Sequence, residues 1–247
     1  MIYKLQDKEA AEPLFRGWEE TMIYSCLQGV MGEIYVTDTK KPQSACAAVG
    51  CFAFFAGRPD AELIKNRPDG SAILVPQNAA WGALTEQCIP GAVKVTRYAM
   101  KKNTVFRVPE LRRIAAMIPD GYELRNIDGD VYDKCLEDPA TADFVAAFAD
   151  KKHYLRYGRG VVVMKGGRIV SGASSYTRYR EGIEIEVDTI KEERRKGLAF
   201  LACASLILQC LSDGLYPSWD AQNKNSVCLA EKLGYEYAHD YTAYEVM

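Results

Sequence analysis

The chain has 247 residues, of which 48% are hydrophobic and 26% are charged, and its formal net charge is −2. This composition is ordinary for a soluble globular protein, and the length suits one large domain or two small ones. A net charge close to zero provides no general basic field for nucleic acid, so any site for an anion has to be local.

The cysteines and the start of the chain bear on location and metal binding. The eight cysteines form no Cys-x-x-Cys pair, and most lie in apolar runs, which predicts buried, reduced thiols in a cytoplasmic protein. The first residues lack the apolar core of a signal peptide, and no apolar run reaches the ~18 residues of a membrane span. With two histidines and scattered cysteines, a metal site is not expected. We therefore expect a cytoplasmic protein that binds neither nucleic acid nor a membrane.

The first half of the chain mixes helical and strand patterns. A one-sided apolar pattern predicts a helix over residues 6–29. Strands are expected over residues 32–38, 44–57, 71–76 and 91–102. Helices are expected after Pro59, over residues 78–88 behind the cap Asn78, and over residues 108–119.

The second half restarts near Asp120 with a strand at residues 122–126 and helices near residues 128–136 and 141–149. The stretch around His153 is interpreted as a solvated loop. A glycine pair, Gly166-Gly167, indicates a hairpin within residues 160–180. Next come an alternating strand at residues 182–189 and an apolar helix that ends near Gly214. The pattern then predicts a strand over residues 216–221, a helix that ends at Gly234, and one or two strands up to Met247. The predicted fold class is α/β, an α+β arrangement around mixed sheets.

A basic turn links the alternating strand to the apolar helix. Arg194, Arg195, Lys196 and Gly197 stand where the helix begins, and a helix N-terminus carries unpaired N–H groups and a partial positive charge. Cations are unfavourable there unless an anion binds, and Gly197 lets the backbone approach an anion closely. The turn has neither the P-loop nor the dinucleotide-binding pattern. Two interpretations remain open at this point, a pyrophosphate site and a solvated basic loop.

Two motifs carry a resemblance to a known family. Arg194-x-x-Gly197-x-Ala199 resembles the [RQ]-x-x-G-x-[GA] acyl-CoA motif of the GCN5-related N-acetyltransferases (GNAT). Residues 223–226 (Asn-Lys-Asn-Ser), followed by "LAEKLGY", resemble a second family signature, and the order of the elements is similar as well. The resemblance covers residues 122–247. The stretch 217–235 looks like a bacterial two-part branch to which the zwittermicin-resistance type of acetyltransferase belongs.

The resemblance implies a domain organisation and a donor site. A GNAT domain would occupy residues 121–247, behind an α/β domain over residues 1–120 that could be a degenerate GNAT-like half. The implied reaction transfers an acetyl group from acetyl-CoA directly to the amine of a small molecule. Pyrophosphate would bind the backbone N–H groups of residues 195–199, with charge-assisted bonds from Arg194 or Lys196, and pantetheine would run beside the end of the 184–189 strand. The implied acetyl-CoA-binding residues are Val187, Asp188, Thr189, Arg194, Arg195, Lys196, Gly197, Leu198, Ala199, Asn223 and Ser226.

The acceptor amine has to lose a proton before it attacks, which calls for a carboxylate base. Glu184, Glu186 and Asp188 share one face of the alternating strand, and we rank Glu186 first, Glu184 second and Asp188 third. The alternative is that these acids line a solvated strand face or pair with Arg178 and Arg180.

One departure from the family pattern concerns the proton for the leaving thiolate. Many members place a Tyr seven residues after the Asn of the second motif, where this chain has Ala230. Tyr235, Tyr237 and Tyr241 are nearby hydroxyls, although such tyrosines usually serve packing, and the thiolate could also leave unassisted. The departure keeps a second reading open, that of a non-catalytic acyl-CoA-binding sensor or regulator. Asn223 could equally serve as a helix cap.

Overall fold

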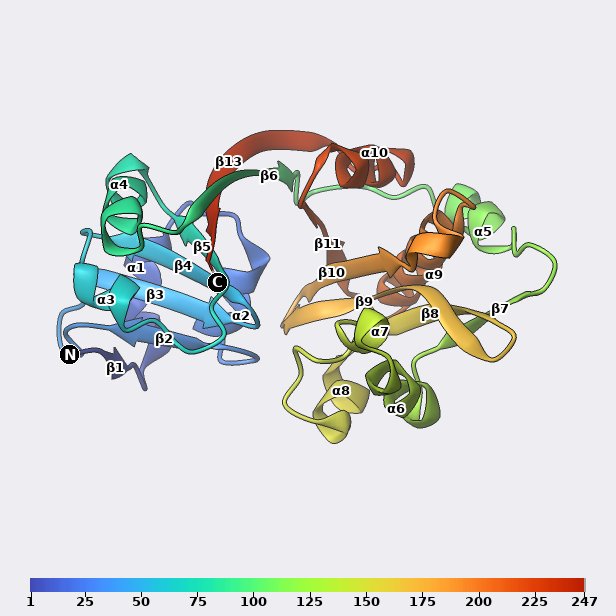
Figure 1. The fold of residues 1–247 in the computed structure, drawn as a ribbon, viewed down its shortest axis with the longest axis horizontal. Helices are drawn as coiled ribbons and strands as arrows, with labels where there is room; N and C mark the ends of the chain where they lie inside the picture. Colours follow the sequence, from blue (N-terminus) through green and yellow to red (C-terminus); the bar gives the residue numbers. More distant parts are fainter. Residues whose placement is uncertain (247) are drawn as a thin grey trace. The chain divides into compact units, whose positions relative to one another are not determined.

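The structure, a computed structural model, describes residues 1–246 and divides into two compact units (Figure 1). Unit 1 consists of Met1–Tyr98 together with the chain from His239 onward, and unit 2 consists of Ala99–Ala238. These compact units have other boundaries than the domains expected over residues 1–120 and 121–247, and that domain assignment stays a prediction.

Unit 1 is built on a mixed sheet in which β1, β2, β3, β4, β5, β13 and β6 follow one another as neighbours. The pairs β1–β2, β2–β3, β3–β4 and β5–β13 are antiparallel. The pair β4–β5 is parallel, and a short helix, α3, connects its two strands. The strands are β1 (Tyr3–Lys4), β2 (Glu33–Val36), β3 (Ser44–Val49), β4 (Phe52–Gly57), β5 (Ile73–Pro76), β6 (Val93–Met100) and β13 (Tyr237–Glu245). The helices are η1 (Lys8–Ala11), α1 (Glu12–Phe15), α2 (Thr21–Leu27), α3 (Ala61–Lys65) and α4 (Ala79–Cys88).

Two predictions in unit 1 were wrong. The expected helix over residues 6–29 is three short helices, because Gly17 takes a left-handed conformation (φ 79°) and Glu20 caps a new helix at Thr21. The expected single strand over residues 44–57 is the hairpin β3–β4, which turns at Gly50 (φ 54°). Both faces of this hairpin are buried, so its apolar run has no alternation that would mark the turn.

Unit 2 holds a five-stranded sheet with the strand order β11-β10-β9-β8-β7. Its pairs are antiparallel except β10 with β11, which are parallel. Its strands are β7 (Tyr122–Asn126), β8 (Gly160–Lys165), β9 (Arg168–Tyr179), β10 (Gly182–Thr189) and β11 (Tyr216–Ser218). The two-residue β12 (Asp220–Ala221) is not part of this sheet. The helices are α5 (Val108–Ala115), α6 (Gly129–Glu137), α7 (Pro139–Ala142), α8 (Lys151–Tyr157), η2 (Lys191–Glu193), α9 (Leu198–Ser212) and α10 (Lys224–Lys232).

In unit 2, helices lie on both faces of the five-stranded sheet (Figure 1). In Figure 1, α6, α7 and α8 are drawn below the sheet, and α5 and α9 above it. α9 contacts β8, β9 and β10 and packs against α5. Eight of its residues are buried, among them Leu201 and Leu206, which explains why the sequence of this helix is apolar on nearly every side.

Two predictions in unit 2 were also wrong. The stretch around His153 is the helix α8 and not a loop, because Asp150 caps it by accepting a hydrogen bond from the His153 N–H (2.7 Å). Of the helix expected near residues 141–149, only the short α7 forms, and turns and bends follow it. The final segment is a single strand, β13, and Met247 lies outside the described residues.

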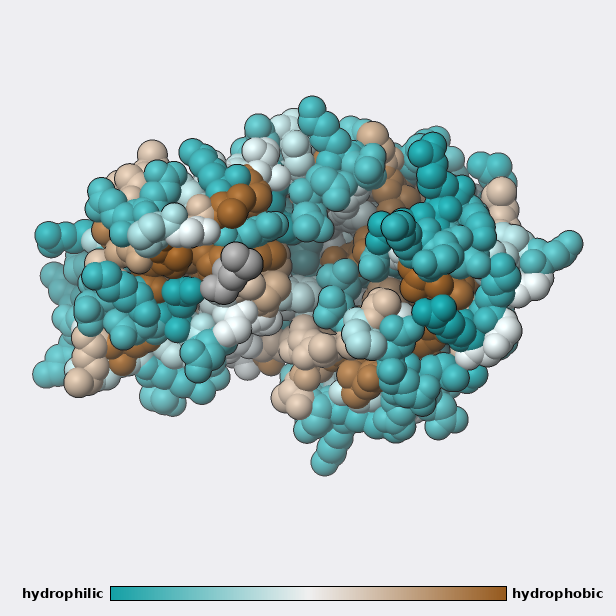
Figure 2. Space-filling model, in the orientation of Figure 1, coloured by the Kyte–Doolittle hydropathy of each residue, from teal (hydrophilic) through white to brown (hydrophobic). Residues whose placement is uncertain are grey.

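The face of the molecule shown in Figure 2 is mostly polar. In the view of Figure 2, hydrophilic residues cover most of the surface, and the hydrophobic areas are small and separate. Within residues 1–246, no helix combines the length and the apolar character needed to cross a bilayer.

Candidate active site

β10 carries three carboxylates whose exposure rises along the strand. Glu184 is buried (3% exposed), Glu186 is half-buried and Asp188 is exposed. Glu186 lies directly opposite Ser174 of β9, whose hydroxyl oxygen is 2.8 Å from that of Tyr154 in α8. Because directly opposite residues share one face of a sheet, Glu186 lies on the face that α8 covers.

The other two acids differ from Glu186 in their surroundings. Asp188 is the last residue but one of β10, and its Oδ1 accepts hydrogen bonds from the Thr189 N–H (2.7 Å) and from an Arg194 guanidinium nitrogen (3.5 Å). Glu184 lies opposite Thr177, next to a register shift that leaves Tyr176 of β9 without an opposite residue on β10. The sequence pattern placed the three acids on one strand, but it did not indicate this gradient of burial.

The strand β10 has a backbone edge that is paired only over its first part. The parallel ladder to β11 joins Gly182, Ile183 and Glu184 to Tyr216, Pro217 and Ser218. From Ile185 to Thr189, the ladders found within residues 1–246 join β10 to β9 alone. Val187, Asp188 and Thr189 therefore lie beside an edge that an extended ligand could join like an added strand.

The basic turn has the backbone conformation expected of an anion site. Gly197 is left-handed (φ 79°), and Arg195 (φ 65°) is the sole non-glycine residue with positive φ among those described. A Cβ built on Gly197 meets no atom within 4 Å, so the turn is open at that point. The α9 helix begins without a side-chain cap or an acid in its first turn. The Leu201 N–H donates to the Gly197 carbonyl (3.1 Å), which is the first hydrogen bond of the helix. The backbone N–H groups of residues 195–200 are therefore available to an anion.

The three cations of the turn are not equivalent. Arg194 donates through Nε to the Thr189 carbonyl (2.8 Å), and Lys196 Nζ lies 2.7 Å from Glu193 Oε2. Arg195 is exposed, and its side chain has no partner within residues 1–246. The resemblance implied charge-assisted bonds to pyrophosphate from Arg194 or Lys196. Both side chains contact the protein itself, and their contact with pyrophosphate stays a prediction.

The second motif forms the start of α10. Asn223 caps this helix, since its Oδ1 accepts a hydrogen bond from the Ser226 N–H (3.0 Å). The Ser226 hydroxyl accepts a hydrogen bond from Nε1 of the buried Trp219 (3.1 Å). These bonds give both residues structural roles, and their predicted contact with the pantetheine arm stays a prediction.

Two of the tyrosines considered as proton donors use their hydroxyl groups in the fold. Ala230, where a Tyr was expected, is fully buried. Tyr235 is buried and donates to the Pro217 carbonyl (2.6 Å), and burial raises its pKa well above the ordinary value. Tyr241 belongs to unit 1, where it accepts a hydrogen bond from Arg97 Nε (3.3 Å). A buried phenol that already donates its proton to a carbonyl is poorly suited to protonate a thiolate.

Cys203 of α9 has a raised pKa, mainly because it is buried. The negative charge of Glu186 raises this pKa further. Cys203 is fully buried, so it remains a thiol and part of the core. Of the eight cysteines, five are buried, Cys51 and Cys88 are half-buried and Cys228 of α10 is exposed, so the expectation of buried thiols was wrong for Cys228.

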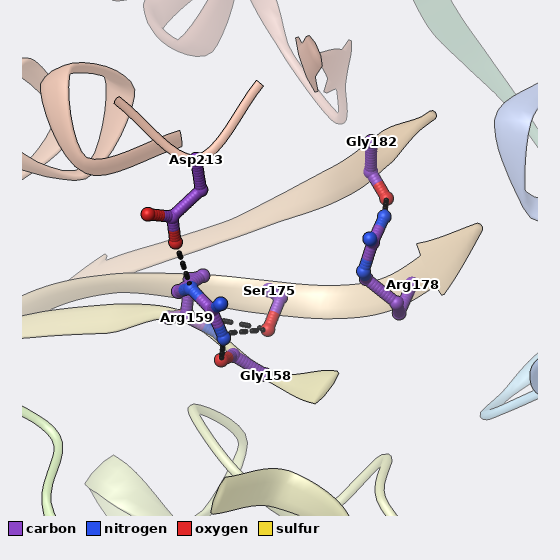
Figure 3. A network of polar contacts seen from close by, with 6 residues as sticks. All are labelled: Gly158, Arg159, Ser175, Arg178, Gly182 and Asp213. Carbon is purple, nitrogen blue, oxygen red and sulfur yellow. Dashed lines mark hydrogen bonds and ion pairs between the residues drawn. The ribbon is translucent and has the colours of Figure 1, made fainter. Parts of the chain in front are cut away.

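Polar contacts fix the far ends of the elements that carry the site (Figure 3). Arg159, just before β8, donates through Nε to Asp213 at the C-terminus of α9 (2.5 Å), and its main-chain N–H donates to the Ser175 hydroxyl (3.0 Å). Arg178 donates to the carbonyl oxygens of Tyr179 and Gly182, which closes the β9–β10 hairpin. The Arg159 contacts join residues 16 and 54 positions apart in the sequence, and no local pattern predicted them.

The comparisons with known proteins define the class of this protein. The family described as GNAT acetyltransferase matches residues 12–244, so the match includes both units. The chain therefore belongs to the GNAT acetyltransferase family, whose members use acetyl-CoA as a co-substrate. The family and the mixed α/β fold predicted from the sequence are thus confirmed.

Particular relatives support this assignment. A GCN5-related N-acetyltransferase-like protein from Streptococcus suis is 45% identical, with a TM-score of 0.94 over 97% of this chain and 98% of that one. YdfB of Bacillus subtilis, named an uncharacterized N-acetyltransferase, is 29% identical over 143 residues. That match takes in 55% of this chain and 52% of YdfB, so the chain spans about half the length of this curated relative. A tandem GNAT protein from the clavulanic acid biosynthesis pathway shares the fold at 12% identity, with a TM-score of 0.53.

Proposed function

We propose that this protein transfers an acetyl group from acetyl-CoA directly to the amine of a small molecule. The observation that carries the proposal is the course of β10. Its edge loses the β11 partner after Glu184, and the strand then leads into the left-handed turn at Arg195 and Gly197. A pantetheine arm beside that edge would end at a turn suited to pyrophosphate.

The donor site in this proposal consists of the residues named from the motifs. Val187, Asp188 and Thr189 would supply backbone groups to the pantetheine arm, and Asn223 and Ser226 would border it. The amides of residues 195–199 would bind the pyrophosphate. Of the turn's cations, Arg195 is the best placed to add charge, since its guanidinium has no partner in the described part of the chain.

Acetyl-CoA supplies the acetyl group as a thioester. Glu186, directly or through a water molecule, would take the proton from the amine, whose nitrogen then forms the new bond to the thioester carbon. Backbone N–H groups on the open edge of β10 would stabilise the charge on the thioester oxygen until the C–S bond breaks. The nitrogen loses its second proton to water as the C–S bond breaks. The leaving thiolate needs no tyrosine in this scheme, because its modest pKa lets it leave unassisted. Glu184 is the second candidate for the base.

The decisive experiment measures thiol release from acetyl-CoA with a panel of small primary amines. We expect at least one amine to raise the release above the rate without an amine, and mass spectrometry to find an acetylated amine. If every amine leaves the rate at background while CoA binds tightly, the protein is a non-catalytic acyl-CoA-binding sensor or regulator. The buried Ala230 at the usual tyrosine position favours that second function.

Three further parts of the proposal concern organisation and setting. We propose a GNAT domain over residues 121–247 and a degenerate GNAT-like half over residues 1–120. The parallel β4–β5 pair connected through the helix α3 supports this, because unit 2 repeats the arrangement with β10, α9 and β11. We also propose membership of the bacterial two-part branch that includes zwittermicin-resistance acetyltransferases, and a cytoplasmic location.

A further inference from the structure

A buried carboxylate lies directly beneath the basic turn. Glu193 is only 9% exposed although it is charged, and it accepts bonds from three side chains. The donors are the Tyr122 hydroxyl (2.5 Å), Lys196 Nζ (2.7 Å) and Lys165 Nζ (2.9 Å). A buried carboxylate is stable only with such partners, so this cluster is a built feature of the fold.

The donors come from three separate places in unit 2. Tyr122 begins β7, Lys165 ends β8, and Lys196 is part of the turn itself. Lys165 also lies over the Tyr122 ring, 4.9 Å from its centroid, and donates to its hydroxyl (3.3 Å). Glu193 therefore ties the turn to the start of β7 and to the end of β8.

The turn needs such a support because its backbone is unusual. Lys196 is flanked by Arg195 (φ 65°) and Gly197 (φ 79°). A left-handed conformation costs a non-glycine residue about 1–2 kcal/mol, so it persists only where neighbouring contacts hold it. The bond from Lys196 to Glu193 is the side-chain contact that holds the residue between these two positions.

We propose that Glu193 is a positioning residue for the donor site. It holds the turn of residues 194–197 open, and it uses the Lys196 side chain as a support for the backbone, so that the Lys196 ammonium group is not a ligand of the phosphate. This inference rests on the proposed function, because it assigns the pyrophosphate of CoA to that turn. Rigid turns bind more tightly than mobile ones, since less ordering is needed on binding.

The test compares Glu193→Gln with Glu192→Gln by calorimetric titration of the full chain with CoA. Glu192 is its exposed neighbour, so both variants remove one negative charge next to the turn. We expect about a tenfold weaker CoA affinity for Glu193→Gln, from the ordering that the turn must then undergo. The control should bind CoA as the wild type does or slightly more tightly, because it loses only a repulsive charge. An affinity of Glu193→Gln equal to or higher than that of the control overturns the proposal.

Two further measurements separate positioning from general damage to the fold. The Michaelis constant for S-acetylpantetheine, which lacks pyrophosphate, should be the same in wild type and Glu193→Gln. An equal loss with both donors contradicts the proposal. Should Glu193→Gln fail to fold, Tyr122→Phe removes a single donor and should show the same selective loss to a smaller degree.

A double variant tests the role given to Lys196. If Lys196 acts only through Glu193, then Lys196→Met with Glu193→Gln should bind CoA no more weakly than the worse single variant. Additive losses would make Lys196 a direct phosphate ligand and overturn this part of the inference. If the wild type binds no CoA at all, the proposed function is wrong. If the wild type and Glu193→Gln bind CoA equally well, only the positioning role of Glu193 is wrong.

Discussion

Glu186 of β10 and Ser174 of β9 face each other directly across the antiparallel ladder. Ser174 is fully buried, and its hydroxyl oxygen is 2.8 Å from that of Tyr154, so one side of Glu186 borders a fixed polar group of the sheet. Because Glu186 is half-buried, a substrate amine can reach its carboxylate, and fewer water molecules surround it than surround an exposed acid. This combination distinguishes it from the buried Glu184 and the exposed Asp188.

The first prediction concerns Glu186→Gln. We expect acetyl transfer to fall by about 10²–10⁴-fold near neutral pH, where the amine is protonated and needs a base. The loss should shrink at high pH, because the amine is then already neutral. The measurement is a pH–rate profile with one active amine. Glu123→Gln, an exposed site on β7, serves as control, and a Glu186→Gln profile that matches the control at every pH would remove Glu186 as the base.

The second prediction concerns the open turn. Gly197→Val should weaken CoA binding at least tenfold, because a side chain at φ 79° strains the turn and occupies the space through which the phosphate approaches. Gly214→Val is a matched control at the other end of α9, since Gly214 also has positive φ (70°) and nothing within 4 Å of its Cβ position. Calorimetry should find normal CoA affinity in this control. Equal loss in both variants would attribute the effect to strain alone.

The third prediction concerns Tyr235→Phe. The phenol hydrogen bond to the Pro217 carbonyl is buried, so its removal should lower the free energy of unfolding by about 1–2 kcal/mol. The turnover number should stay within about twofold of the wild type, because the hydroxyl is committed to the fold. Urea unfolding and steady-state kinetics measure the two effects. A tenfold lower turnover with unchanged stability would instead make Tyr235 the acid that protonates the thiolate.

The fourth prediction concerns the pH dependence of stability. Hydrogen bonds from Lys196, Tyr122 and Lys165 lower the pKa of Glu193 from 4.5 to about 2. A carboxyl whose pKa is lower in the folded state stabilises the fold above its unfolded pKa and loses this effect as the pH falls towards the folded value. The wild type should therefore exceed Glu193→Gln in stability most clearly above about pH 5, and this difference should shrink between about pH 4.5 and 2.

Urea midpoints of wild type and Glu193→Gln at pH 7, 4 and 3 measure that difference. Glu192→Gln is again the reference for the loss of one charge. If this stability difference stays constant over the range, the pKa of Glu193 is the same in the folded and the unfolded protein, and the prediction is wrong.

Much of the second half could be predicted from the sequence because its signals are local. The alternation around Ile183 and Ile185, the glycine pair of the β8–β9 hairpin and the Asn223 cap each depend on neighbouring residues alone. The hairpin β3–β4 could not be predicted, since a strand buried on both faces has no alternation. The cap at Asp150 was overlooked, although an acid before a helical pattern could have revealed α8.

The supports of the candidate site were beyond sequence reasoning. Tyr122, Lys165 and Glu193 are brought together only by the pairing of β7 with β8 and by the end of η2. Motif spacing identified the turn but not which of its cations is engaged by the fold. Pairing partners of charged side chains depend on the tertiary structure, so Arg195 could be distinguished from Arg194 and Lys196 only after folding.

Unit 1 can be completed only after β13, near the end of the chain, has been synthesised. Unit 1 includes the chain from His239 onward, and Tyr244 pairs with Leu74 and donates a hydrogen bond to Glu86 (2.7 Å). About 140 residues of unit 2 are translated between the two parts of unit 1. At about 5–20 residues per second, roughly 7–28 s pass on the ribosome before the partner strand of β5 is synthesised. During that interval the nascent first unit exposes a β-sheet edge to chaperones and to other chains.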